Sequence, residues 1–478
     1  MYTIQNYING DLLSPTKKEY LDVFDPSEGK IYAKVPNSDI SDVEKAVYAA
    51  EAAFPNWSTT PIGERSRILT KIADLIEANL DHLAKAESLD NGKPIWLAKS
   101  VDIPRASSNF RFFAQAITQF STLAHEMSDA MNYTLRQPLG VVGTISPWNL
   151  PLYLFTWKIA PALVTGNCVI AKPSEVTPMS AYLLSEICIE AGLPKGVLNI
   201  IHGDGAKVGA EMTKHPKIKA ISFTGSTRVG KEIAKVAAPM FKKVSLEMGG
   251  KNPNLIFADC DYEKMLRTTV RSSFGNQGQI CLCGSRILVE QSIYEQFKRD
   301  FVNIVKEMKV GHPADPTSKQ GAIVSKVHYE KILSYIELAK EEGGTILAGG
   351  HAVCPKGYEK GWYIAPTIIE GLSPNCRTNQ EEIFGPVVTI MPFETEAEVL
   401  QYANGTHYGL SCTIWTENIS RANRLAKNIQ AGIVWINTWL HRDLRTPFGG
   451  VKNSGVGREG GWEALRFFTE AKNICIAF

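Results

Sequence analysis

The stretch Gly140-Val-Val-Gly-Thr-Ile145 is a short apolar run with β-branched residues that leads into a polar loop. Similar runs follow at 166–171, 196–201 and 218–223. Amphipathic stretches, such as 178–191 and 206–214, lie between them. Short strands that alternate with helices are typical of βαβ units and of a parallel sheet covered on both faces. This part of the chain therefore predicts a doubly wound α/β domain.

A second set of alternating patterns follows Asn252 and predicts another α/β domain, with a boundary near Gly249-Gly250. Its strand-like runs occupy 254–257, 286–289, 387–391, 412–415 and 432–436, and its helical patterns occupy 263–273, 293–308 and 325–342. Nearer the N-terminus, apolar residues at three- and four-residue spacing predict helices over 40–53 and 62–89, which Pro55 and Pro61 separate.

Two further strand-like segments, 127–137 and 473–478, have no helix partner of their own. We expect them to serve in edge pairing, including pairing with another subunit. The predicted division of the chain is therefore one α/β domain from 1–120 and 140–249, a second from 250–445, and a small β oligomerisation element from 121–139 and 446–478.

Composition describes an ordinary globular protein. The chain has 478 residues, enough for about two to three domains. Its hydrophobic content is 44%, its formal net charge is +2, and it has no basic run, which argues against nucleic acid or an anionic membrane as a partner. The first ten residues show no secretory signal, and nine cysteines, an odd number, fit a reducing compartment. We expect a cytoplasmic protein.

The run from Phe274 to Arg286 places Cys281 directly after the polar stretch Asn-Gln-Gly-Gln. Most cysteines are structural, but this flank is too polar for a core strand. Glu247 precedes the paired glycines at 249 and 250. A thiol that attacks a carbonyl carbon, together with a carboxylate that activates water, is what covalent acyl chemistry requires. We therefore predict Cys281 as the nucleophile and Glu247 as the base.

Two other segments that follow predicted strands carry candidate site residues. Asn149 stands between two prolines and is a suitable donor to an oxyanion, although an isolated asparagine of this kind is more often a turn residue. Lys172 and Glu175 can bracket a ribose, and Glu175 would repel a 2′-phosphate, which favours NAD over NADP; the alternative is a solvated loop.

The glycine motifs for phosphate binding are weak individually. Gly203-Asp-Gly205-Ala-Lys-Val-Gly209 has one residue too many between its last glycines for the dinucleotide fingerprint. Phe223-Thr-Gly-Ser226 follows a strand and precedes a helix, so its hydroxyls and N–H groups suit a pyrophosphate.

Seven segments in this order resemble the aldehyde dehydrogenase superfamily nearly from end to end. They are Ser146-Pro-Trp-Asn149, Lys172-Pro-Ser-Glu175, Phe223-Thr-Gly-Ser226, Glu247-Met-Gly-Gly-Lys-Asn-Pro253, Gly278-Gln-Ile-Cys281, Glu382-Ile-Phe-Gly-Pro386 and Pro447-Phe-Gly-Gly450. Met248 is the one mild departure, because the family commonly has leucine there, and the change conserves volume.

The resemblance implies a cofactor and a role for each matching residue. It implies NAD bound by the first domain, a catalytic second domain, and a homodimer or homotetramer joined through the β element. It implies Cys281 as nucleophile, Glu247 as general base and Asn149 with the Cys281 N–H as the oxyanion hole. The cofactor-binding residues implied are Ile145, Trp148, Lys172, Glu175, Gly205, Gly209, Ser226, Met248, Glu382 and Phe384.

Within the superfamily, three segments are most similar to the 2-aminomuconic and 2-hydroxymuconic semialdehyde dehydrogenases: 102–113, 281–286 and 439–444. That resemblance implies that Arg105 and Arg442 bind a substrate carboxylate, which suits the guanidinium fork. The alternative is that both are ordinary surface arginines.

Three other functions remain open from the sequence. A broad-specificity or betaine-type aldehyde dehydrogenase would want aromatics and acids in its pocket rather than arginines. A cofactor-free thiol hydrolase lacks a recognisable histidine partner among His202, His312 and His441. A non-catalytic scaffold is disfavoured by the presence of both Cys281 and Glu247. Cys283 is expected to pack rather than to form a disulfide with Cys281, since such a bond would be strained.

Overall fold

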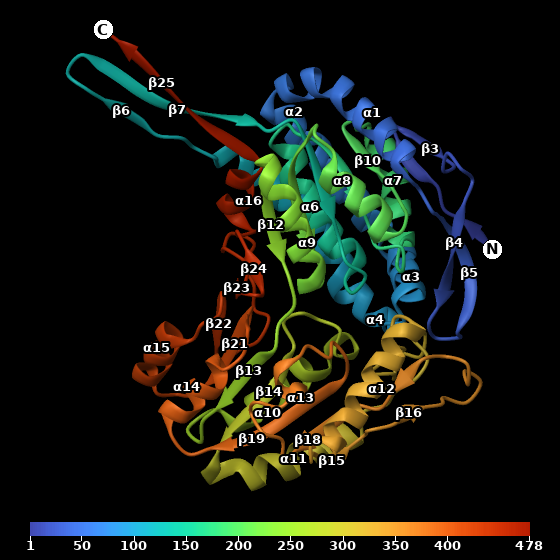
Figure 1. Cartoon of the computed structure of the whole chain (residues 1–478), viewed down its shortest axis with the longest axis vertical. Helices are drawn as coiled ribbons and strands as arrows, with labels where there is room; N and C mark the ends of the chain where they lie inside the picture. Colours follow the sequence, from blue (N-terminus) through green and yellow to red (C-terminus); the bar gives the residue numbers. More distant parts are fainter.

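The computed structural model describes all 478 residues and shows two α/β lobes with a projecting β arm (Figure 1). The first lobe is built on an eight-stranded sheet of order β24-β12-β11-β8-β9-β10-β2-β3, with β24 (Gly455–Val456) at one end and β2 (Asn6–Ile8) and β3 (Asp11–Leu13) at the other. Its parallel strands are β8 (Val141–Ile145), β9 (Cys168–Lys172), β10 (Leu198–Ile200), β11 (Ile218–Thr224) and β12 (Lys243–Glu247). The predicted doubly wound α/β fold is confirmed.

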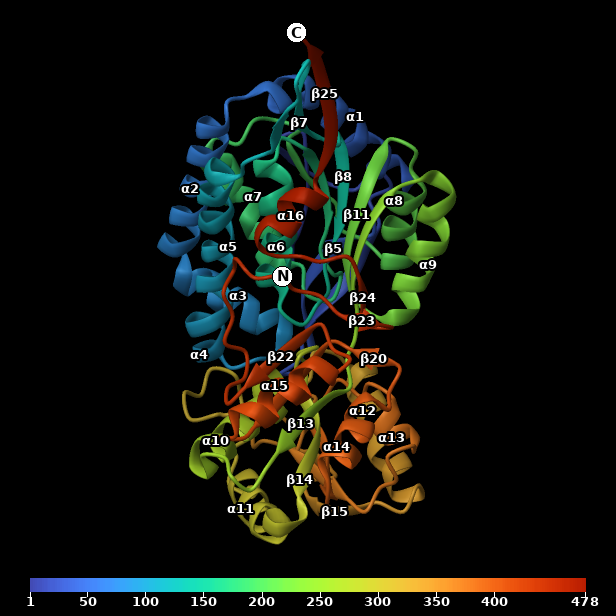
Figure 2. The same ribbon diagram turned by 90° about the vertical axis from the view of Figure 1, so that its left-hand side faces the viewer.

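Helices cover both faces of this sheet (Figure 2). One layer contains α2 (Ile62–Ala78), α3 (Leu80–Asn91), α5 (Ile103–Ala116), α6 (Pro151–Val164) and α7 (Met179–Ala191). The other contains α1 (Ile40–Thr59), α8 (Ala210–Lys214) and α9 (Thr227–Ala237). Every residue of α6 is buried, because this helix lies between the sheet and the outer helices, and its sequence carries no amphipathic pattern for that reason.

Two helix boundaries differ from the prediction. Pro55 does not end the first helix, which continues to Thr59 and buries Trp57 with its indole N–H donating to the Leu163 carbonyl. Tertiary packing of the last turn therefore outweighs the local cost of a proline. The predicted second helix is interrupted at Asn79 and continues as α3, which ends at Gly92 in the left-handed conformation.

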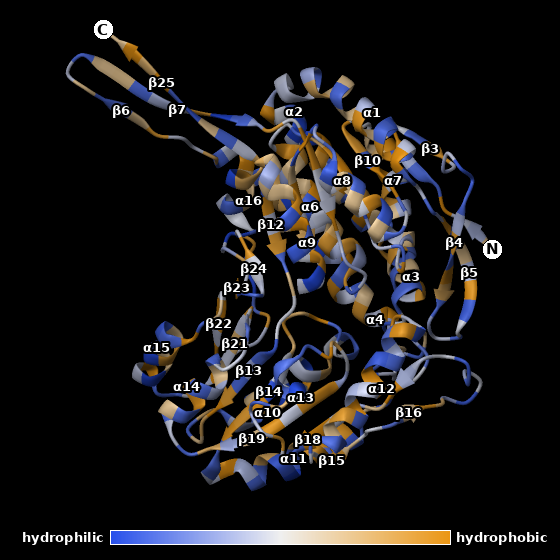
Figure 3. Ribbon diagram, viewed as in Figure 1, coloured by the Kyte–Doolittle hydropathy of each residue, from blue (hydrophilic) through white to orange (hydrophobic).

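The second lobe contains a seven-stranded sheet of order β15-β18-β19-β14-β13-β21-β22. Its strands are β13 (Asn252–Ile256), β14 (Gly284–Glu290), β15 (Thr345–Ala348), β18 (Thr367–Glu370), β19 (Val387–Phe393), β21 (Ser411–Trp415) and β22 (Ile433–Ile436). All neighbours pair in parallel except β15 at one edge. Figure 3 shows the buried strand β19 as largely hydrophobic and the outer helix α15 as largely hydrophilic.

Helices also cover this second sheet on both faces. They are α10 (Tyr262–Phe274), α11 (Tyr294–Lys306), α12 (Lys326–Glu341), α14 (Glu396–Asn404) and α15 (Ile419–Asn428). One buried apolar cluster joins α10 and α11 to the sheet, and a separate cluster joins α14 and α15 to it.

The shorter elements of the whole chain are α4 (Ile95–Leu97), α13 (Arg377–Gln380), β16 (Ala352–Val353), β17 (Tyr363–Ile364), β20 (Tyr408–Gly409) and β23 (Val451–Lys452).

The arm consists of β6 (Ala124–Glu126), β7 (Ala130–Pro138) and β25 (Thr469–Ala477). β25 runs antiparallel to β7 from Thr469 opposite Pro138 to Ala477 opposite Ala130, so the two predicted strands pair with each other. The segment expected to belong wholly to the arm, 446–478, is divided: β24 (Gly455–Val456) pairs with β12, and α16 (Gly461–Phe467) packs beside α6 in the first lobe.

The N-terminal strands were not anticipated from the sequence. β1 (Tyr2–Thr3), β4 (Tyr20–Asp25) and β5 (Lys30–Pro36) form a small sheet, while β2 (Asn6–Ile8) and β3 (Asp11–Leu13) extend the eight-stranded sheet at one edge. β1, β2 and β3 have only two or three residues each, and β2 also pairs with the remote strand β10, so local patterns carry little signal. β4 and β5 pair with each other as a local hairpin. No helix in the structure combines the length and apolar character needed to cross a bilayer.

Candidate active site

The order of strands in the first sheet reverses between β8 and β11. From β8 the chain proceeds outward through β9 and β10, and then crosses to β11 and β12 on the other side. Ligands of open α/β sheets bind beyond the carboxyl ends of the strands at such a switch point. The loops after Ile145 and Thr224 flank this point, and they carry the predicted motif residues Trp148, Asn149 and Ser226.

A cavity of about 170 Å³ opens at this edge and reaches Cys281. Besides Cys281, its lining includes six of the residues predicted for the site: Trp148, Asn149, Ser226, Met248, Glu382 and Phe384. Ser226 caps α9, with its hydroxyl accepting from the Val229 N–H. The Thr224 hydroxyl also lines the cavity and is buried without a hydrogen-bond partner, as is the nearby Ser146 hydroxyl. These unpaired groups fit a polar ligand such as a dinucleotide.

Further along the same edge, Ile145, Lys172 and Gly209 lie together. A Cβ on Gly209 would stand 3.7 Å from Ile145 Cδ1 and 3.8 Å from Lys172 Cδ. Lys172 Nζ forms an ion pair with Glu175 at 2.9 Å. Gly205 begins a short π-helical turn that ends at Gly209. Four of the predicted cofactor-binding residues, Ile145, Lys172, Glu175 and Gly209, are thus neighbours in space.

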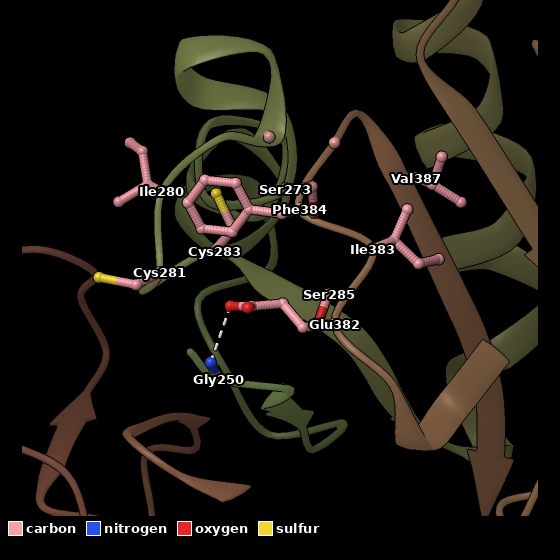
Figure 4. A pocket seen from close by; sticks show the side chains of 12 residues that line it. Gly250, Ser273, Ile280, Cys281, Cys283, Ser285, Glu382, Ile383, Phe384 and Val387 are labelled. Atoms are coloured by element: carbon pink, nitrogen blue, oxygen red, sulfur yellow. Dashed lines mark hydrogen bonds between the residues drawn. The ribbon is translucent and has the colours of Figure 1, made fainter. Parts of the chain in front are cut away.

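The loop that carries Cys281 is strained and tightly held. Asn276 and Gln277 have φ of 51° and 55°, in the left-handed region. A side chain at Gly278 would collide with the Gly385 carbonyl, since its Cβ would be 2.1 Å from that oxygen. Asn252 Nδ2 donates to the Cys281 carbonyl at 2.7 Å. Figure 4 shows Cys281 pointing away from Cys283, and both are free thiols.

Cys281 also lines a second cavity, of about 290 Å³. This cavity is mostly apolar and contains Glu247, Tyr153, Trp439 and Arg442. The thiol therefore stands at the junction of two cavities, one with the dinucleotide motifs and the other with the predicted base. That arrangement can present a small substrate and a cofactor to the same sulfur atom.

Glu247 is enclosed without a hydrogen-bond partner. Both of its carboxylate oxygens are buried and unpaired, and Gly449 leaves room for them, because a Cβ there would be 2.6 Å from Oε1. Burial, followed by the charge of Glu459, raises the pKa of Glu247 well above its ordinary value. Glu459 itself is paired with Lys158 at 2.5 Å. Once deprotonated, a carboxylate with a raised pKa is a stronger base toward water than an ordinary one.

The electrostatics around the thiol also favour the protonated form. Burial raises the pKa of Cys281, and the nearby carboxylates of Glu382 and Glu247 raise it further, while Arg442 opposes them. Glu382 Oε1 accepts from the Gly250 N–H at 2.8 Å (Figure 4), and a Cβ on Gly249 would be 2.1 Å from Oε2. The paired glycines thus allow Glu382 to reach this position.

Asn149 and Phe384 are held by specific contacts. Asn149 Nδ2 donates to the Gln279 carbonyl at 2.9 Å, two residues before the thiol. Phe384 has φ of 64° and meets the Trp148 ring edge-on at 5.3 Å. Its carbonyl lies 2.7 Å from His328 Nε2. His328 lines the same cavity as Cys281, but this contact engages its Nε2, which disfavours the thiol–histidine pair that a cofactor-free hydrolase would need.

The two predicted substrate arginines converge on Tyr153. Arg442 lines the larger cavity, and its guanidinium donates to the Tyr153 hydroxyl at 2.8 Å. Arg105 lies 5.4 Å from the Tyr153 ring centre and does not line the cavity wall. Neither arginine has an acidic partner within ion-pair distance.

Sequence reasoning missed several residues that the fold brings to the site. Thr224, His328 and Lys331 line the smaller cavity, and Tyr153, Arg271 and Glu459 line the larger one. Apart from Thr224, none of these residues belongs to a motif that would identify it as a site residue from the sequence. Only Thr224, inside Phe223-Thr-Gly-Ser226, lay within a segment already considered.

Comparison with known proteins agrees with this architecture. The model of the aldehyde dehydrogenase family matches residues 13–474. A solved NAD⁺ complex of aldehyde dehydrogenase from Bacillus cereus superposes with a TM-score of 0.97 at 38% identity, covering 100% of this chain and 97% of that one. The chain belongs to the aldehyde dehydrogenase family.

Its curated relatives include semialdehyde dehydrogenases of high sequence identity. The 2-aminomuconic semialdehyde dehydrogenase of Danio rerio is 49% identical over 99% of this chain and 98% of its own length. The 2-hydroxymuconic semialdehyde dehydrogenase of Pseudomonas sp. (strain CF600) is 45% identical over the full length of both chains. The resemblance inferred from the seven segments is confirmed.

Proposed function

We propose that this chain is an NAD-dependent aldehyde dehydrogenase that oxidises a carboxylate-bearing semialdehyde, such as 2-aminomuconic or 2-hydroxymuconic semialdehyde. The observation that carries the proposal is the position of Cys281 between two cavities, one lined by the dinucleotide motifs and one by Glu247 and Arg442. Family membership and the substrates named for the relatives support the same reaction and substrate class.

In the first step the Cys281 thiolate adds to the aldehyde carbon. The carbonyl oxygen gains negative charge and accepts hydrogen bonds from Asn149 Nδ2 and the Cys281 N–H. One such donor typically contributes about 3–4 kcal/mol to lowering the barrier. NAD, when bound, supplies the nicotinamide ring that accepts the hydride. Loss of that hydride leaves a thioester on Cys281.

In the second step Glu247 removes a proton from water, and the resulting hydroxide attacks the thioester carbon. The carbonyl re-forms, the carbon–sulfur bond breaks, and the carboxylic acid leaves while the thiolate is restored. The unpaired carboxylate oxygens of Glu247 are free to accept that proton. The apolar lining of the cavity limits competing water.

The residues proposed to hold the cofactor are those assembled along the sheet edge. Lys172 and Glu175 would hold the adenosine ribose, and Ser226 and Trp148 would lie near the pyrophosphate. Glu382 and Phe384 would position the nicotinamide half. Ile145, Gly205, Gly209 and Met248 would complete the surface. The neighbouring positions of these residues support this assignment.

Arg442, together with Arg105, is proposed to bind the carboxylate at the far end of the substrate. A guanidinium can donate two parallel hydrogen bonds to a carboxylate. The absence of an acidic partner at either arginine leaves this capacity available, and Tyr153 holds Arg442 in place.

Assembly and location are also proposed here. The first lobe would be the NAD-binding domain, 250–445 the catalytic domain, and the arm of β6, β7 and β25 an oligomerisation element in a homodimer or homotetramer. The arm exposes Met131, Leu135 and Ile476, apolar side chains that a partner subunit could cover. Nine free thiols favour the cytoplasm.

The deciding experiment measures NADH absorbance with purified protein, NAD and a panel of aldehydes. We expect a higher kcat/KM for muconic semialdehydes than for uncharged aldehydes of equal length. Oxidation of every aldehyde at the same efficiency would contradict the substrate assignment, and no NADH from any aldehyde would contradict the reaction.

A further inference from the structure

The main-chain carbonyl of Asn149 accepts hydrogen bonds from three different side chains. Asn276 Nδ2 donates at 3.0 Å, Asn91 Nδ2 at 3.3 Å and Lys93 Nζ at 3.3 Å. A carbonyl oxygen has two lone pairs, so three donors exceed the number needed to satisfy its hydrogen-bonding capacity. All three donor residues are buried. The peptide that carries the proposed oxyanion donor is therefore anchored from several directions.

Two of these donors come from the end of α3. Asn91 closes that helix and also donates to the Trp148 carbonyl at 3.0 Å, and Lys93 follows after Gly92. The Lys93 ammonium is fully enclosed and is neutralised by Asp102 at 2.7 Å and by Glu87 at 3.7 Å. Breaking such a buried ion cluster is strongly unfavourable, so it holds Lys93 against Asn149 rigidly.

Asn276 comes from the other direction, because it belongs to the loop of Cys281. Its Nδ2 donates both to the Asn149 carbonyl and to the Gln279 carbonyl, the latter at 3.3 Å. The reversed amide would place an oxygen against two carbonyl oxygens, so this orientation is the only favourable one. Asn276 occupies left-handed backbone, which asparagine tolerates better than most residues.

The Gln279 carbonyl closes this network, since it also accepts from Asn149 Nδ2 at 2.9 Å. A carboxamide is planar, and its two N–H bonds point in fixed directions about 120° apart. Once one N–H is committed to Gln279, the direction of the other is determined. Asn276 Nδ2 donates to both the Gln279 and the Asn149 carbonyls. The second N–H of the Asn149 carboxamide therefore keeps a fixed position relative to the Cys281 loop.

We propose that Asn276 is a positioning residue that locks the oxyanion donor Asn149 to the loop of Cys281, with Asn91 and Lys93 securing the opposite side. The inference rests on the proposed function, because it takes Asn149 as the oxyanion donor. It assigns to Asn276 an effect on the step in which the oxyanion forms, and none on the reactivity of the thiol itself.

Two variants separate the side chain from the backbone strain. Asn276→Gly removes the carboxamide but adopts the left-handed conformation freely. Asn276→Ala removes the carboxamide and adds strain. If the carboxamide matters, both variants lose activity; if only the backbone matters, Asn276→Gly retains wild-type activity. Asn276→Asp, which also tolerates this backbone, replaces the donor by an acceptor that faces two carbonyls, and its loss should be at least as large.

The readouts are single-turnover NADH formation with saturating NAD and aldehyde, and alkylation of Cys281 by iodoacetamide. Alkylation displaces iodide from carbon, forms a carbon–sulfur bond and creates no oxyanion. We expect NADH formation in Asn276→Gly to fall by on the order of 10- to 100-fold, as for a misplaced catalytic group. We expect alkylation to proceed at the wild-type rate, with the thermal midpoint little changed.

Three results would overturn the inference: wild-type NADH formation in Asn276→Gly, an equal fall in alkylation and NADH formation, or a loss confined to KM. These results are distinct from failure of the proposed function, which would appear as no NADH formation by the wild-type protein. If Asn276→Ala fails to fold, the Asn276→Gly and Asn276→Asp comparison still decides between the alternatives.

Discussion

Glu247 and Cys281 line the same cavity of about 290 Å³, although they come from different lobes of the chain. Glu247 ends β12 of the first sheet, and Cys281 follows the loop after α10. Neither carboxylate oxygen of Glu247 has a hydrogen-bond partner. A buried carboxylate without partners is costly to maintain, and sites that carry out proton transfer tolerate this cost.

Glu247→Gln should accumulate the thioester. Glutamine keeps the shape of the side chain but cannot take a proton from water, so hydrolysis stalls after hydride loss. Stopped-flow absorbance should show one equivalent of NADH per site, followed by a steady-state rate lower by about 10²–10⁴-fold. Cys281→Ala is the control and should show no initial NADH. Unimpaired steady-state turnover in Glu247→Gln would remove Glu247 from the proposed role.

Activity should rise with pH. Burial raises the pKa of both the Cys281 thiol and the Glu247 carboxyl, and in both cases the deprotonated form is the reactive one. Raising the pH through these elevated pKa values therefore increases the active fraction. The rate of Cys281 alkylation, measured without cofactor, should climb steadily from pH 6 to pH 9 in proportion to the thiolate. A flat profile would mean that the thiol is already ionised.

Arg442→Ala should impair acidic substrates selectively. Removing a hydrogen bond to a charged group costs about 1.5–3 kcal/mol, which corresponds to roughly a 10- to 100-fold rise in KM for a semialdehyde acid. A neutral aldehyde of similar length should show little change. Arg105→Ala should act in the same direction. Arg445→Ala is the matched control, because Arg445 is exposed and paired with Asp443. Equal effects on acidic and neutral aldehydes would argue against carboxylate recognition.

Glu175→Ser should relax the preference for NAD over NADP. Glu175 is paired with Lys172 at the edge of the first sheet, where its carboxylate would repel a 2′-phosphate. Removing the acid also frees the Lys172 ammonium to attract that phosphate. We expect the KM for NADP to fall and that for NAD to rise. Steady-state kinetics with both cofactors measure this, and an unchanged ratio of kcat/KM would show that Glu175 does not contact the ribose.

Most of the central parallel strands of both lobes could be predicted from short apolar runs, because parallel strands buried on both faces show a continuous local signal. The runs did not include β12, β15 or β18. Helix α6 escaped this reasoning, since it is buried on all sides and has no periodic pattern. Pro55 was misread as a helix end because the packing of Trp57 against the Leu163 carbonyl is not visible locally. Among the N-terminal strands, β1, β2 and β3 were missed because two or three residues carry too little pattern, and β2 meets β10 only in the folded chain. The local hairpin of β4 and β5 was missed as well.

The sequence by itself determined the kinds of chemical group available and the short segments that carry them: the thiol of Cys281, the carboxylate of Glu247 and the carboxamide of Asn149. Residue identity and local spacing suffice for that, because both are properties of neighbouring positions. Only the tertiary structure decided which distant side chains lie near them, such as Glu459 beside Glu247 and Arg442 on the cavity wall. It also placed Arg105 against the Tyr153 ring, outside that wall. Long-range packing sets these neighbours, and burial sets the pKa of each group, so neither can be read from a local pattern.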